Sequence, residues 1–190
     1  MNAPVFVDTN VLIYALDDAD RKKQSAARQW RAELWRRRQG RISFQVLQEF
    51  YVKVTRKWPK VRREAQSEVR DLMAWRPVSV DGLILEHAWK IQDRYQLSFW
   101  DALIVAAAKS ASCSYLLTED LQSGQDFECL LVVNPFRNDP ASLLTALCLS
   151  GCFSKPQLVV YGHAAPSVCE NLARVPVDVL YRRSLPEVSG

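Results

Sequence analysis

Short apolar runs that favour β-strands alternate with helix-like segments along the first 137 residues of the chain. A strand, a helix and a second strand form the unit that builds parallel sheets, because the helical crossover returns the chain to the same end of the sheet. The alternation therefore predicts an α/β fold, in which helices cover both faces of a parallel sheet.

The pattern predicts five strands and six helices. The strands are expected at 4–7, 41–44, 77–80, 114–118 and 130–134, and the helices at 11–16, 20–39, 45–58, 60–75, 81–95 and 98–110. Gly40 is expected to end the helix 20–39, and Pro59 to end the next one. A chain of 190 residues that is 48% apolar and 24% charged can bury one full core.

Four carboxylates occupy positions at which an open α/β sheet builds its functional site. Asp8 ends the first expected strand and Asp120 follows the fourth, while Glu49 and Asp101 lie on helices next to those strands. Ligands of such sheets bind beyond the carboxyl ends of the strands, so the four acids can converge if strand 4–7 is central. We predict that these four side chains form one catalytic and metal-binding site.

Carboxylates that crowd together cannot all stay ionised at neutral pH unless a cation lies among them. Hard oxygen ligands select Mg²⁺ or Mn²⁺ over zinc or copper, and the chain has only two histidines, His87 and His163. Such ions activate water and stabilise a leaving oxygen, which is the chemistry of phosphodiester hydrolysis.

Each acid also has a purely structural interpretation, which stays open on the sequence alone. Asp8 can cap the helix that follows it, and Glu49 can be a solvated helix residue. Asp101 stands at a capping-box spacing from an upstream serine, an arrangement that is compatible with metal binding. Asp120 can be a turn residue, and its neighbour Glu119 can take its place in the site.

Positive charge is concentrated in one part of the sequence. Fifteen basic residues lie between Arg21 and Arg63, where the only acids are Glu33 and Glu49, although the net charge of the chain is just +4. A polyanion-binding face requires such a basic flank, because each neutralised phosphate releases counterions. A solvated helix surface is the alternative. The candidates for polyanion binding are Arg36, Arg37, Arg38 and Arg41.

The five cysteines are odd in number and contain no C-x-x-C pair, so they form neither a disulfide framework nor a familiar zinc pattern. They are Cys113, Cys129, Cys148, Cys152 and Cys169. We expect buried or incidental thiols in a reducing cytoplasm. The start of the chain has no signal-peptide pattern, and no apolar stretch reaches about 18 residues, so neither secretion nor a membrane partner is expected.

Five short blocks of the sequence, taken in their order and spacing along the chain, form a recognisable pattern. They are Val7-Asp8-Thr9-Asn10 with Val11-Leu12-Ile13-Tyr14 after it, Gln48-Glu49-Phe50, the block from Ser98 to Ala107, the block from Leu116 to Leu121, and Val133-Asn134-Pro135-Phe136. In combination these blocks resemble the PIN-domain nucleases, in particular the VapC-type toxins of bacterial toxin-antitoxin pairs. The resemblance covers residues 3–137, roughly seventy per cent of the chain.

The resemblance implies a three-layer α/β/α sandwich with a five-stranded parallel sheet. It implies an endoribonuclease that uses Mg²⁺ or Mn²⁺ to cleave RNA, in many relatives a structured RNA such as tRNA. Asp8 would be the central metal ligand, completed by Asp101 and Asp120, and Glu49 would bind directly or through water. The side chains Asn10 and Thr118 would orient these carboxylates from behind.

The same resemblance implies partners. The toxin of a type II toxin-antitoxin pair binds RNA as its substrate, is held inactive by a cognate antitoxin protein, and is commonly a homodimer. The four arginines at 36–38 and 41 then become candidates for RNA binding.

The C-terminal part departs from the resemblance. Small relatives usually end soon after the Asn134-Pro135-Phe136 position, whereas this chain continues for about fifty residues. We expect a nuclease domain at 1–138 and a C-terminal extension at 139–190. An accessory segment, an inhibitory flap and a segment without a contribution all stay open for the extension.

Two other functions compete with the nuclease on the sequence alone. Phosphatases of the haloacid-dehalogenase type also begin with an acidic loop after the first strand, but they need a second Asp two positions later, where this chain has Asn10. The other rival is a catalytically silent PIN-like module that associates with RNA or an antitoxin. The complete set of four acids argues against such a module.

Overall fold

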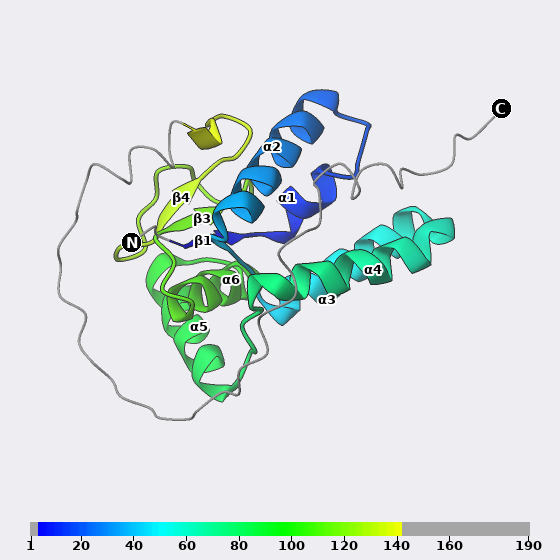
Figure 1. The fold of residues 1–190 in the computed structure, drawn as a ribbon. Coiled ribbons are helices and arrows are strands. Elements are labelled where there is room, and N and C mark those ends of the chain that lie inside the picture. The colour runs from blue at the N-terminus through cyan, green and yellow to red at the C-terminus, as the bar shows by residue number, and fades with distance from the viewer. Residues whose placement is uncertain (1–3, 142–190) are drawn as a thin grey trace. The chain divides into compact units, whose positions relative to one another are not determined.

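The computed structural model describes residues 4–141, which form a parallel sheet with helices on both sides (Figure 1). The strands are β1 (Val5–Val7), β2 (Gly40–Arg41), β3 (Tyr115–Leu117) and β4 (Leu131–Val133). Within this part of the chain their order is β2-β1-β3-β4, and every neighbouring pair is parallel. Because β1 has β2 on one side and β3 on the other, its carboxyl end is the point at which ligands of such sheets bind.

Helices make up the two outer layers. Figure 1 shows α2 on one side of the strands and the α5–α6 pair on the other, as the alternation in the sequence predicts. The α/β fold is thus confirmed. The helices are α1 (Thr9–Tyr14), α2 (Arg21–Arg37), α3 (Phe44–Lys57), α4 (Arg62–Leu72), α5 (Gly82–Tyr95) and α6 (Phe99–Ser110), with short 3-10 turns η1 (Pro59–Val61) and η2 (Met73–Trp75).

Five helices begin at a side chain that accepts a hydrogen bond from a backbone N–H of the first turn. These caps are Asp8, Asp20, Ser43, Asp81 and Ser98. Such caps satisfy N–H groups that have no partner inside the helix, and each stabilises it by about 1 kcal/mol. Two of the five caps, those of α1 and α6, stand at the predicted site.

The core lies between the sheet and the helices. All of β1 is buried, and α6 is buried at every position from Ala102 to Ala108, which explains why its sequence is apolar on all sides. The indole of Trp30 is fully buried and donates its N–H to the carbonyls of Pro135 and Asn138, at 3.0 and 3.1 Å. This side chain ties α2 to the segment that follows β4.

The predicted strand at 77–80 is wrong for the described residues. Only one isolated parallel bridge, between Ser43 and Val78, forms there, so the sheet has four strands and not five. Pro77 has no N–H to donate, and Asp81 already caps α5, so little backbone is left to extend the pairing.

Gly40 does not end α2, contrary to the prediction. The helix ends at Arg37, and Arg38 takes the left-handed conformation with φ 57°. Gly40 begins β2 and is buried against the indole of Trp75, where a Cβ on residue 40 would lie 2.6 Å from two ring carbons. The glycine is therefore required by a close approach and not by a helix end.

Two of the five cysteines lie in the described part of the chain. Cys113 is buried and Cys129 is exposed, and both are free thiols, whereas the other three cysteines and most of the C-terminal extension lie outside the described residues. No helix between residues 4 and 141 is both long and apolar enough to cross a membrane.

We expect Gly40→Ala to lower the free energy of unfolding by about 1–3 kcal/mol, because the added methyl group must displace the Trp75 ring. Chemical denaturation measures the change. Gly82→Ala is the matched control, since its Cβ would meet nothing within 4 Å at the start of α5. Equal stability of the Gly40→Ala and Gly82→Ala proteins would contradict the packing argument.

Candidate active site

Asp8 lies at the carboxyl end of β1, where it caps α1. Its Oδ1 accepts from the Thr9 N–H at 2.6 Å, and its Oδ2 accepts from the Thr118 hydroxyl at 2.7 Å. The Asp8 N–H donates to the Leu117 carbonyl of β3 at 3.0 Å. The capping interpretation is therefore correct, and it coexists with a place in the site, because the same carboxylate lines a cavity.

The amide of Asn10 bridges two of the acids. Its Nδ2 lies 3.1 Å from Asp8 Oδ2, 3.0 Å from Asp120 Oδ2 and 3.2 Å from the Thr118 hydroxyl. The Thr118 hydroxyl also accepts from the Asp120 N–H at 3.1 Å. Asn10 thus contacts both carboxylates, and Thr118 contacts the carboxylate of Asp8 and the backbone N–H of Asp120.

Glu49 reaches the same cavity from the middle of α3. Its Oε2 accepts from the Thr9 hydroxyl at 3.2 Å and lies 3.4 Å from Lys53 Nζ, while its Oε1 accepts from the amide of Gln45 at 2.9 Å. A freely solvated helix residue would not be held by a side chain 40 positions away in the sequence. The solvated interpretation of Glu49 is therefore wrong.

Asp101 stands in the first turn of α6. Its Oδ2 accepts from the Ser98 hydroxyl at 2.6 Å, and its N–H donates to the same oxygen at 3.2 Å. The capping spacing that the sequence indicated is present, and the Asp101 side chain nevertheless lines the cavity.

Asp120 and Glu119 have separate surroundings. Asp120 lines the cavity, whereas Glu119 pairs with Lys23 of α2 at 2.5 Å and is absent from the lining. Lys23 is held in turn by the Tyr14 hydroxyl at 3.1 Å and lies over the Tyr14 ring. The ion pair with Lys23 removes Glu119 from the candidate site and leaves Asp120 there.

The cavity that gathers the four acids has a volume of about 500 Å³. Four segments far apart in the sequence build it. They are Asp8 with the first turn of α1, α3, the first half of α6, and the segment after β3. Its lining is Asp8, Thr9, Asn10, Gln45, Gln48, Glu49, Lys53, Trp100, Asp101, Ile104 and Asp120.

Burial of the Asp8 carboxyl raises its pKa from 3.8 to about 6. The hydrogen bonds from Thr118 and the Thr9 N–H oppose this rise, and the negative charges of Asp120 and Glu49 add to it. An acid whose pKa is raised by burial and by neighbouring acids is one that a cation would stabilise.

The donor set suits a hard divalent cation, although residues 4–141 contain no group of three acidic, histidine or cysteine side chains close enough to hold one. The ligands available at the cavity are oxygens, the kind that Mg²⁺ and Mn²⁺ prefer. Two buried oxygens, Asn10 Oδ1 and Gln45 Oε1, have no hydrogen-bond partner. The unpaired Asn10 Oδ1 belongs to the amide that contacts Asp8 and Asp120, so it suits the place of a cation or of its water shell.

The predicted polyanion-binding arginines lie away from this cavity. Arg36 and Arg37 pair with Glu33 at the end of α2, and Arg41 is in β2, where it pairs with Phe6 and its guanidinium donates back to the carbonyls of Arg38 and Gly40. Arg36 and Arg37 therefore stand at the edge of the sheet where the strands begin, while Asp8 marks the opposite edge. Their proposed contact with RNA stays a prediction.

Sequence reasoning missed six residues of the lining: Thr9, Gln45, Gln48, Lys53, Trp100 and Ile104. A signal for three of them was present. Gln45 and Lys53 stand four residues before and after Glu49, and Gln48 is adjacent to it, so all three share the region of the helix surface around that acid.

Residues 5–123 match the PIN domain family, more than half of the chain, and the chain therefore belongs to that family. PIN domains are generally nucleases. The resemblance predicted from the sequence is confirmed at the level of the family.

One solved structure is described as a toxin-antitoxin complex from Klebsiella pneumoniae. It is similar to this chain with a TM-score of 0.50 and 22% identity, over 69% of this chain and 97% of that chain. At this identity the likeness shows the fold alone. No curated protein sequence matches the chain.

We expect Asp8→Asn to stabilise the metal-free protein at pH 8 by about 1–3 kcal/mol, because ionised Asp8 opposes folding when its folded pKa is about 6 and its unfolded pKa is 3.8. The penalty is absent below pH 4, grows between pH 4 and 6, and is complete above pH 6. Asparagine caps helices as well as aspartate does, so the N-terminus of α1 is preserved.

Thermal and chemical unfolding in EDTA at pH 4 and pH 8 test this expectation. The gain of Asp8→Asn should be present at pH 8 and absent at pH 4. A variant that is less stable than wild type at pH 8 would show that the Asp8 carboxylate is not strained by its surroundings.

Proposed function

We propose that this chain is a divalent-metal-dependent endoribonuclease that hydrolyses phosphodiester bonds in RNA, and that it is the toxin of a type II toxin-antitoxin pair. One observation carries the proposal. Four acids that are scattered over more than a hundred residues line a single cavity at the carboxyl end of β1, in a chain of the PIN domain family.

In this proposal Asp8, Asp101 and Asp120 hold Mg²⁺ or Mn²⁺, and Glu49 binds directly or through water. A cation held there would supply Lewis-acid chemistry for hydrolysis of a phosphodiester bond. Asn10 orients the carboxylates of Asp8 and Asp120, which its amide contacts at 3.1 and 3.0 Å, and Thr118 orients the Asp8 carboxylate, to which its hydroxyl donates at 2.7 Å.

Glu49 is suited to a proton-handling or water-orienting role at the rim. Its two oxygens accept from Thr9 and Gln45, which fixes the carboxylate, and Lys53 lies close enough to balance its charge. A positioned carboxylate beside an activated water is the arrangement that general base catalysis needs.

The proposed partners are an RNA substrate, with tRNA as one class, a cognate antitoxin protein and a second copy of the chain. A structure of similar fold is described as a toxin-antitoxin complex, which supports the antitoxin as a partner. The proposed location is the cytoplasm, where RNA and an antitoxin are both present.

A catalytically silent PIN-like module is the second candidate function. It is favoured by the finding that no three acids of residues 4–141 are close enough to chelate a metal ion. The nuclease is preferred because the Asn10 amide, and not a bulky or positive side chain, separates Asp8 from Asp120.

Cleavage assays separate the two candidates. Labelled tRNA and mRNA are incubated with the full chain in Mg²⁺, Mn²⁺ or EDTA. We expect metal-dependent cleavage. Asp8→Asn and Asp120→Asn should each reduce its rate by about 100-fold or more, because a bound cation would lower the activation barrier by several kcal/mol.

Glu119→Gln is the matched control, since it removes the neighbouring acid that pairs with Lys23 outside the cavity. It should retain cleavage close to the wild-type rate. Equal cleavage by wild type and Asp8→Asn would indicate a contaminant, and binding of RNA without cleavage in any metal would support the silent module.

We further propose that the nuclease unit is residues 1–138 and that residues 139–190 are an extension. The Trp30 indole donates to the carbonyls of Pro135 and Asn138, so hydrogen bonds between α2 and the segment after β4 extend to residue 138. A chain that stops at Asn138 should unfold cooperatively and keep its cleavage activity. Loss of the cooperative transition in calorimetry or denaturant would contradict this boundary.

A further inference from the structure

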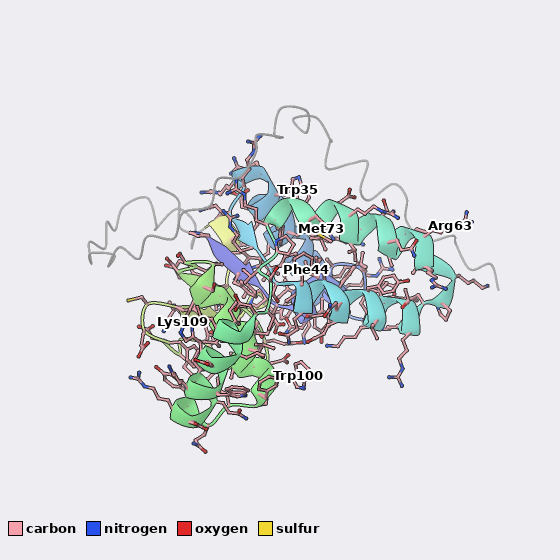
Figure 2. All side chains as sticks on the ribbon, turned by 90° about the horizontal axis from the view of Figure 1, so that it is seen from below. Trp35, Phe44, Arg63, Met73, Trp100 and Lys109 are labelled. Carbon is pink, nitrogen blue, oxygen red and sulfur yellow. The ribbon has the colours of Figure 1, made fainter. Side chains whose placement is uncertain are left out.

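Two helices form facing walls of the cavity. From α3 come Gln45, Gln48, Glu49 and Lys53, and from the start of α6 come Trp100, Asp101 and Ile104. Figure 2 shows Trp100 at the edge of the α5–α6 pair, on the side toward α3. The acids therefore share their cavity with an aromatic ring on one wall and two amides on the other.

Trp100 is the most exposed tryptophan of the described residues. Its side chain is 62% exposed, although burying an indole is favourable. The Phe99 ring packs against it at 5.4 Å between centroids and 66° between planes, and Phe99 is itself packed against the α5–α6 core. The indole is thus anchored at one edge and offers its remaining surface at the cavity.

Gln45 adds a second, independent observation. It is only 6% exposed and lines the cavity, and its Nε2 donates to Glu49, but its Oε1 has no partner. A buried oxygen without a partner is costly unless a ligand or water donates to it. The base edges and the 2′-hydroxyl of RNA carry such donors.

Lys53 supplies positive charge at the same wall. Its ammonium lies 3.4 Å from Glu49, and its side chain is 56% exposed, so it can reach a phosphate near the acids. Aromatic stacking combined with nearby positive charge is how proteins bind single-stranded nucleic acid.

We propose that Trp100, together with Gln45 and Gln48, forms a nucleobase subsite next to the carboxylates, which takes one unpaired base of an RNA strand. The indole stacks on the base, the α3 amides bond to its edge or to the ribose, and Lys53 contacts the adjoining phosphate. Bases inside a duplex are stacked and cannot enter, so the subsite selects single strands, loops and bulges. This subsite rests on the proposed function for its substrate class.

Equilibrium binding in an Asp8→Asn background tests the subsite, because this background is not expected to cleave. A fluorescently labelled single-stranded RNA of twelve nucleotides and its duplex are titrated with the full chain in Mg²⁺. We expect the single strand to bind more tightly than the duplex, and Trp100→Ala to weaken single-strand binding about tenfold, the typical loss of one stacked base.

Two further variants separate stacking from a structural effect. Trp100→Phe keeps an aromatic face and should recover most of the lost affinity. Trp89→Ala is the matched control, because Trp89 is 52% exposed on α5 and does not line the cavity, and it should bind like the background.

The outcomes also separate the subsite from the proposed function. Unchanged binding by Trp100→Ala, an equal loss in Trp89→Ala, equal affinity for duplex and single strand, or no binding by the background would each overturn the subsite, even if wild type cleaves RNA. Trp100-dependent binding by a wild-type chain that cleaves nothing would support the subsite and overturn the nuclease.

Discussion

The hydrogen bonds that converge on the carboxylate of Asp8 connect the fold to the candidate site. The Thr9 N–H, the Thr118 hydroxyl and the Asn10 amide all donate to it. The first of these hydrogen bonds caps α1, and the second links the carboxyl ends of the neighbouring strands β1 and β3. One side chain therefore both caps a helix and connects two strands at their ends. Burial raises the pKa of Asp8, and the hydrogen bonds from Thr118 and Thr9 make this rise smaller.

The amide of Asn10 and a divalent cation would compete for the same oxygen lone pairs. Without a cation, the N–H groups of Asn10 lie between Asp8 and Asp120 and reduce the repulsion between them. The other end of that amide, Oδ1, is buried without a partner. Rotation of the amide would place an acceptor oxygen, instead of a donor, between the two carboxylates.

Sequence predicted the α/β fold and the gathering of the four acids because both follow from local patterns. Asp8 and Asp120 follow neighbouring parallel strands, and the ends of such strands meet at one edge whatever the details of packing. The errors arose where distant contacts decide. Gly40 had the local signal of a helix end, but Trp75, 35 positions later, explains it. The run at 77–80 looked like a strand, but Pro77 and the cap at Asp81 leave only the bridge at Val78.

The distribution of positive charge along the sequence did not predict which basic residue lines the cavity. The densest arginine cluster, Arg36 to Arg38, lies where the strands begin, whereas Lys53, an ordinary lysine four residues after Glu49, lines the cavity. Exposed charges further apart than about 8–10 Å are largely screened at physiological salt. In the proposed nuclease, a cluster at the far edge can attract RNA to the molecule, but only groups on the cavity walls can determine which nucleotide meets the acids. The proposed selectivity for a nucleotide therefore depends on the cavity wall that α3 and Trp100 form, and not on the arginine cluster.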